Sequence, residues 1–150
     1  MGVYPFYNIP KFSIDTSRPI ILPKGYPTSP VTIGEHIHKK RLDSNLKQSD
    51  IAKLVGVSAS TIWNWEHSSE PDLKHVPSII KYLGYVPFDK PGNVGIFEKL
   101  RYYKLINGLT IKQLAKDIGC HHEQLMDWMG GKVRPCKRNM EVIEKFVDAL

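Results

Sequence analysis

The sequence has few cysteines and no apolar stretch long enough to cross a membrane. Cys120 and Cys136 are the two cysteines among 150 residues, which argues against a disulfide framework and fits a reducing environment. No apolar run approaches the roughly 18 residues that a transmembrane helix needs, and the N-terminal residues lack the basic start and long apolar core of a secretory signal. We therefore expect a cytoplasmic protein without membrane contact.

Sequence signatures of catalysis are also missing. No nucleophile and base stand at a meaningful spacing, and there is no glycine-rich phosphate loop or carboxylate pair. The segment Cys120, His121, His122 and the later Cys136 contain zinc-ligand types, but adjacent positions at a helix start diverge, whereas tetrahedral zinc needs convergent ligands. We expect no enzyme activity, no metal or cofactor site and no small-molecule substrate.

The composition describes a globular protein with a moderate positive charge. Hydrophobic residues make up 41% and charged residues 24% of the chain, which excludes an intrinsically disordered protein. The net charge of +6 favours anionic partners. The excess is spread along the chain, so any affinity for nucleic acid depends on where the charges lie rather than on a polycationic tail.

Residues 1–31 combine many prolines with aromatic residues. Proline at this density excludes a helix or a central strand. We predict an extended arm that its aromatic side chains pin in part to the core. In a second interpretation the arm wraps DNA or a partner subunit, with Lys11, Arg18 and Lys24 facing phosphates.

Two short helices joined by a tight turn are predicted within Leu46 to Glu66, LKQSDIAKLVGVSASTIWNWE. Gly56 suits the left-handed end of the first helix, and Ser58 suits the N-cap of the second. The first helix, residues 48–55, carries apolar residues at helical spacing, so that one face can be buried, namely Ile51, Ala52, Leu54 and Val55. The second turns Ile62 and Trp65 inward and leaves outward Ser58, Ala59, Ser60, Trp63 and Asn64. This is the pattern of a helix-turn-helix, whose second helix enters a DNA major groove.

The stretch resembles the lambda-repressor-like helix-turn-helix family, also called the Cro/repressor or xenobiotic-response-element type. The family pattern is matched in order by Leu46, Gln48, Ala52, Gly56, Val57, Ser58, Ile62, Trp65 and Glu66. The resemblance implies that the helix opening near Ser58 reads bases and that Gln48 holds the phosphate backbone.

The surrounding residues complete a first unit, residues 32–84. Thr32 and Glu35 form a capping-box pattern at the start of a helix. A basic band on that helix is either a solvated face or a flank for the DNA backbone, and it consists of His38, Lys39, Lys40 and Arg41. Pro77, inside the apolar run of residues 73–83, predicts either a kink or a separate turn before a helix that starts there.

The same pattern returns 63 positions later, after a connector at residues 85–93. Leu109, Ala115, Gly119, Leu125 and Trp128 fall on Leu46, Ala52, Gly56, Ile62 and Trp65. A constant offset without gaps indicates a duplicated supersecondary unit. We predict a second, diverged helix-turn-helix in residues 94–150, with Thr110 as an N-cap. A final helix, roughly residues 137–150, would bury Met140, Ile143, Phe146, Val147 and Leu150.

The second unit departs from the pattern where it would meet DNA. Ile111 stands in place of Gln48, and Glu123 and Asp127 bring negative charge to the supposed reading helix. Candidate contacts remain in Lys112, His121, His122, Lys132 and Arg134. The unit is therefore either a second DNA-reading site or a degenerate copy kept for packing or dimerisation.

We predict an all-α protein in which an extended proline-rich arm precedes two tandem lambda-repressor-like helix-turn-helix bundles. Its expected function is that of a transcriptional regulator of prokaryotic or phage type that binds double-stranded DNA, with a homodimer as a possible state. Asn64 could contact adenine, and Ala59 a thymine methyl. Trp63 either packs on the arm or the last helix, or lies against sugar and phosphate at the groove edge. The alternative function is a protein-interaction module, an antitoxin or adaptor, with weakened DNA reading.

Overall fold

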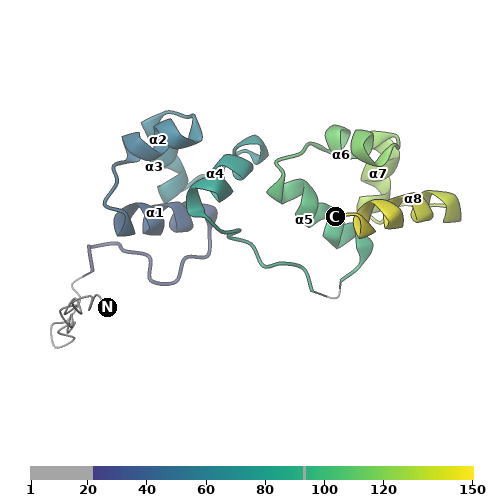
Figure 1. Ribbon diagram of the computed structural model, residues 1–150, viewed down its shortest axis with the longest axis horizontal. Helices are drawn as coiled ribbons and strands as arrows, with labels where there is room; N and C mark the ends of the chain where they lie inside the picture. The colour runs from purple at the N-terminus through teal and green to yellow at the C-terminus, as the bar shows by residue number, and fades with distance from the viewer. Residues whose placement is uncertain (1–21, 93) are drawn as a thin grey trace, which may run out of the picture.

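The computed structural model describes residues 22–92 and 94–150, and over these ranges every regular element is a helix (Figure 1). The predicted all-α class is confirmed. Most of the predicted arm, residues 1–21, lies outside the described residues. None of the helices in the two described ranges combines the length and the apolar character that a membrane crossing requires.

The first half of the molecule contains four α-helices and a short 3-10 helix between residues 33 and 83. In order, these are α1 (Ile33–Asp43), α2 (Gln48–Val55), α3 (Ala59–His67), η1 (Leu73–His75) and α4 (Val76–Leu83). The pair α2 and α3 encloses the predicted turn, and α1 and α4 pack against the pair (Figure 1).

The helix ends follow the chemistry predicted for them. The Thr32 hydroxyl accepts the Glu35 backbone N–H at 3.2 Å, and the Glu35 carboxylate accepts the Thr32 N–H at 3.2 Å. The Ser58 hydroxyl accepts the Thr61 N–H at 3.1 Å. Gly56 adopts the left-handed conformation, with φ of 82°. Each cap satisfies a backbone group that the helix itself leaves without a partner.

Pro77 lies in the first turn of α4, directly after η1. Of the two alternatives, the structure shows the separate turn and not a kinked helix. The first turn is where proline fits, because the N–H that it lacks has no partner inside the helix.

The first core lies where α1, α2, α3 and α4 meet. It consists of Ile33, Ile37, Ile51, Ala52, Val55, Ile62, Trp65, Ile79 and Leu83, with Phe88 of the connector packed against it. The prediction that Leu54 belongs to the buried face of α2 is wrong, because this side chain is 65% exposed. Leu54 lies at the edge of the face that α3 and α4 cover.

The crossing of α1 over α3 depends on the absence of a side chain at Gly34. A Cβ atom there would lie 1.8 Å from the backbone oxygen of Trp65, far inside van der Waals contact. The equivalent residue of the second half, 63 positions later, is Phe97. Its ring excludes an equally close crossing of the corresponding helices.

The first two helices of the second half repeat the boundaries of α1 and α2. Its helices are α5 (Ile96–Ile106), α6 (Ile111–Ile118), α7 (His122–Met129) and α8 (Lys137–Asp148). The bounds of α5 and α6 lie 63 positions after those of α1 and α2, and Thr110 caps α6 as predicted, its hydroxyl accepting the Gln113 N–H at 3.3 Å. Membership of this half in the same family stays a prediction.

A second core lies between α5, α6, α7 and α8. It consists of Leu100, Leu114, Ala115, Ile118, Leu125, Trp128, Met129 and Ile143. Of the residues expected to be buried by the last helix, Ile143 is fully buried, and Phe146 and Val147 pack against the core. The expectation for Leu150 is wrong, since α8 ends at Asp148 and Leu150 is 59% exposed.

We predict that Gly34→Ala lowers the free energy of unfolding by about 3 kcal/mol, because the new methyl group forces α1 away from α3. Urea denaturation measures the change. Gly95→Ala is the matched control, since Gly95 has an ordinary φ and no atom lies within 4 Å of the place that its new methyl group would take. Equal effects of the two substitutions would contradict the close crossing.

Candidate nucleic-acid interface

The outer face of α3 presents the five residues that the sequence pattern placed there. Ile62 and Trp65 are turned inward, with exposed fractions of 0% and 7%. The side chains left in solvent are Ser58, Ala59, Ser60, Trp63 and Asn64. Their exposure leaves them available to a partner, and their role in DNA contact stays a prediction.

Hydroxyl groups form an ordered cluster at the start of α3. The Ser58 hydroxyl lies 2.8 Å from that of Ser60 and 2.8 Å from that of Thr61. These contacts hold the side chains in place before any partner arrives. A surface ordered in this way spends less side-chain entropy on binding.

Trp63 stacks on His67, one helical turn later. The ring centroids are 4.3 Å apart and the planes differ by 19°. The Nδ1 atom of His67 lies 2.8 Å from the Trp63 carbonyl oxygen, so Nδ1 carries the proton that this bond requires. The expected alternatives for Trp63 did not include this partner, although the i, i+4 spacing of two rings on one helix could have identified it.

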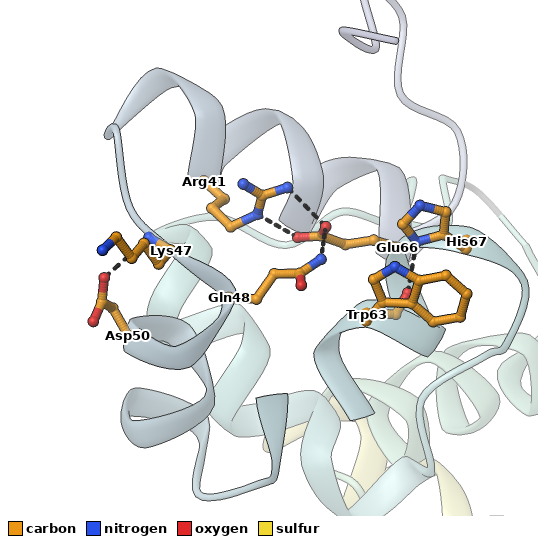
Figure 2. A network of polar contacts seen from close by, with 7 residues as sticks. All are labelled: Arg41, Lys47, Gln48, Asp50, Trp63, Glu66 and His67. Atoms are coloured by element: carbon orange, nitrogen blue, oxygen red, sulfur yellow. Dashed lines mark hydrogen bonds and ion pairs between the residues drawn. The ribbon is translucent and has the colours of Figure 1, made fainter. Parts of the chain in front are cut away.

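A carboxylate at the end of α3 ties three helices together (Figure 2). Glu66 accepts two hydrogen bonds from Arg41 of α1, at 2.6 Å from Nε and 2.8 Å from Nη2. It also accepts the side-chain amide N–H of Gln48, at 2.8 Å. Glu66 is 9% exposed, and its side chain is fully buried. The Gln48 side chain is thereby oriented at the start of α2.

The pKa of Glu66 reflects two opposed effects. Burial acts to raise it, but the hydrogen bonds from Arg41 and Gln48 and the charge of Arg41 outweigh burial, so the pKa lies below the ordinary value of 4.5. The pKa of Arg41 is raised, chiefly by its hydrogen bonds to Glu66. Both groups are therefore charged at neutral pH.

Two other titratable side chains near this cluster, His38 and Tyr82, are partly shielded from solvent. Burial lowers the pKa of His38, against the opposing charge of Glu66. Burial also raises the pKa of Tyr82 to about 12, and its hydroxyl has no hydrogen-bond partner within the described residues. Neutral His38 and neutral Tyr82 leave Arg41 and Glu66 as the charged pair of the cluster.

Sequence reasoning placed Gln48 and Glu66 in the family pattern but did not connect them with Arg41. The signal that could have indicated this pair was the presence of an arginine, Arg41, in the first helix and of a carboxylate, Glu66, at the end of the third. The structure thus assigns Arg41 an internal partner, and the basic band is only partly a free surface.

Lys39 contacts the segment that precedes α1. The ammonium group of Lys39 donates to the Thr28 carbonyl at 3.3 Å and lies 5.9 Å from the centre of the Tyr26 ring. The Tyr26 hydroxyl in turn donates to Asp43 at 2.7 Å. Lys40 is half-buried near the end of α1. The contacts of Lys39 hold the segment before α1 against that helix.

The candidate residues of the second half lie on and around α6 and α7. Lys112, His121 and Arg134 are exposed, and His122 is half-buried. Lys132 lies 3.6 Å from the Asp127 carboxylate, so part of its charge is offset. His121 occupies the N-cap of α7 without the side-chain hydrogen bond that Ser58 makes in the first half.

The second half also lacks the buried polar cluster. The positions equivalent to Arg41, Gln48 and Glu66 hold Lys104, Ile111 and Met129. The amide and the carboxylate are both replaced by apolar groups. The glutamine in the first turn of α6, Gln113, lies two residues after Ile111 and accepts the Thr110 backbone N–H at 2.8 Å. Within residues 22–92 and 94–150, no three His, Cys, Asp or Glu side chains are grouped as a metal site would require.

We predict that Glu66→Gln lowers the free energy of unfolding by about 3 kcal/mol at neutral pH, because Arg41 keeps its charge and loses its carboxylate. The pKa of Glu66 is lowered by folding, so its contribution is present above about pH 4.5 and is lost as the pH falls through the folded value. Denaturation at a series of pH values should therefore show a weaker loss of stability in acid for the variant.

Asp127→Asn is the control for this measurement. Its pair with Lys132 is exposed, with side-chain exposures of 40% and 72%, and should change stability by less than about 1 kcal/mol. A similar cost for both substitutions would contradict the importance of the buried pair.

The comparisons with known proteins agree with the geometry of the first half. Residues 37–90 match the family model described as "Helix-turn-helix". No curated protein and no solved structure matches the chain significantly. The matched range contains the Gln48, Arg41 and Glu66 cluster and all of α2 and α3. Residues 37–90 are thus similar to a helix-turn-helix family, and α2 and α3 are the helix pair within that range.

Proposed function

We propose that the protein is a transcriptional regulator of prokaryotic or phage type that binds double-stranded DNA by placing α3 in the major groove. The observation that carries this proposal is the exposed face of α3. This helix is the second of the pair joined at Gly56, and its inner face packs into a buried core. An α-helix fits the width of the major groove, and a helix presented in this way can reach the base edges.

Gln48 is the proposed contact to the DNA backbone. One N–H of its amide is held by Glu66, which fixes the orientation of the group. Its second N–H is left to donate to a phosphate oxygen at the start of α2. A preoriented neutral donor positions the protein on the duplex and carries no sequence information.

Reading of bases falls to the short side chains of α3. Asn64 can form two hydrogen bonds with adenine, and Ala59 can contact a thymine methyl. Ser58 and Ser60 have short reach, and their hydroxyl groups already hydrogen-bond each other. Trp63 adds an apolar surface at the groove edge. We infer that a single unit discriminates only modestly between DNA sequences. A second reading unit, either the second half or another copy of the chain, would raise the specificity by binding a second half-site.

A protein-interaction module, an antitoxin or adaptor, is the second candidate function. It is favoured by the negative charge of Glu123 and Asp127 on α7 and by the exposed Met126 on the same helix. Ile111 also stands at the position that corresponds to Gln48, so the proposed backbone donor is missing there. In that case the second half holds a protein partner and DNA binding is weak. Neither candidate includes a catalytic step or a cofactor.

We predict that affinity for a random-sequence duplex falls steeply with salt, because bound cations leave the DNA when lysines and arginines meet phosphates. Fluorescence anisotropy at a series of salt concentrations measures the slope of log affinity against log salt. Weak binding that does not depend on salt would favour the interaction module.

Two substitutions then separate positioning from reading. Gln48→Ala should weaken binding to all sequences, since it removes a backbone donor, and circular dichroism should check that the fold survives. Asn64→Ala should cost about 1–3 kcal/mol on a selected site and much less on random DNA. If Asn64→Ala weakens both equally, Asn64 does not read bases.

Lys112→Ala tests the second half. If α6 flanks a phosphate, the variant should bind more weakly and lower the salt slope by about 1. Lys145→Ala, which removes an exposed lysine from α8 of the same half, is the matched control. Identical behaviour of the two variants would exclude a specific contact at Lys112.

A further inference from the structure

The turns that follow α1 and α5 have the same backbone design. In the first, Ser44, Asn45 and Leu46 donate their N–H groups to Lys40, Leu42 and Arg41, at 3.0–3.1 Å. In the second, Asn107, Gly108 and Leu109 donate to the residues 63 positions later, Tyr103, Leu105 and Lys104, at 2.9–3.2 Å. The middle residue is left-handed in both, with φ of 51° at Asn45 and 62° at Gly108.

The comparison shows that the left-handed conformation alone does not require glycine at position 108. Asparagine adopts it readily, because its short side chain tolerates this region. Asn45 holds the same conformation in the same hydrogen-bonded turn and is exposed. Another constraint must therefore act on Gly108.

That constraint is the contact of Gly108 with the first half. A Cβ atom on Gly108 would lie 2.5 Å from the Leu73 backbone oxygen and 2.9 Å from Cδ of Pro77. The Leu73 oxygen is itself fixed, because it accepts the Val76 N–H at the end of η1. Backbone of the second half thus rests directly on backbone of the first, with no room for a side chain between them.

Two further observations place a packed junction at this contact. Helices α4 and α5 contact each other, and the first turn of α4 contains Pro77, which Gly108 approaches. Val76 is 2% exposed although it belongs to neither of the two cores. A buried apolar side chain in the first turn of α4, beside the contact, fits a packed junction there.

We propose that Gly108 is a positioning residue that locks the two halves into one rigid body and so fixes the spacing between α3 and α7. This part of the proposal rests on the contact of Gly108 with Leu73 and Pro77 and on the packing of α4 against α5, and it does not depend on DNA binding. Its consequence for DNA rests on the proposed function: a rigid pair of helices accepts sites of one spacing, whereas two tethered units accept many.

The test exchanges the residues of the two turns. Gly108→Asn places at the junction the residue that the first turn uses, so the turn can form while the contact cannot. Asn45→Gly is the matched control in the exposed turn. Residual dipolar couplings of the backbone amides, measured by NMR on the full chain, report whether the two halves align as one body.

We expect one alignment tensor to fit both halves in the unchanged protein and in Asn45→Gly, and two different tensors to be needed for Gly108→Asn. Two tensors in the unchanged protein, or one tensor in Gly108→Asn, would overturn the proposal. If Gly108→Asn does not fold, Gly108→Ala is compared with Asn45→Ala, because both carry an alanine in the left-handed region and only the first meets the junction.

The DNA measurement is separate. Sites selected from random duplexes by the unchanged protein should contain two half-sites at one spacing, and Gly108→Asn should bind them roughly tenfold more weakly, because the second contact loses its effective concentration. An unchanged affinity would overturn the effect on spacing. Absence of any DNA binding would refute the proposed function, while the tensors would still decide the role of Gly108.

Discussion

Glu66 is the residue on which the first half of the protein depends most directly. Its carboxylate is buried, and a buried charge without partners would be strongly unfavourable. Arg41 and Gln48 supply those partners from two other helices. The position of α3, the charge state of the cluster and the orientation of Gln48 therefore follow from one group. The buried Glu66 thus also orients the Gln48 amide, which we propose contacts DNA.

The second half shows how four helices in a similar order along the chain pack without that group. Lys104, Ile111 and Met129 replace the members of the cluster, and Met129 joins the apolar core. Replacing a buried polar network as a whole avoids leaving one member unpaired, which is the costly outcome. The bundle of α5 to α8 thus keeps an apolar core without that cluster, and Ile111 stands in the place of Gln48. Comparison of the two halves thus indicates that a bundle of four helices can form without the polar cluster, whereas the proposed backbone contact requires the oriented Gln48.

Much of this structure could be predicted from local sequence chemistry. Caps at Thr32, Ser58 and Thr110 and the left-handed Gly56 depend on neighbouring residues only, so periodicity and capping patterns suffice. The contacts that could not be predicted join residues far apart in sequence. Arg41 could have faced solvent or Glu66, and Gly108 looks like an ordinary turn glycine until Leu73 is seen beside it. Leu54 and Leu150 were misjudged because an apolar residue is buried only where another element covers it.

The packing of Phe88 bears on where the first half can be cut. This residue belongs to the connector, yet its ring covers the core formed by α1 to α4, and the family match likewise continues to residue 90. A fragment that stops at Gly84, where α4 ends, would leave that core open to water at one side. The shortest fragment suited to expression and crystallisation as a separate domain therefore includes the connector through residue 90.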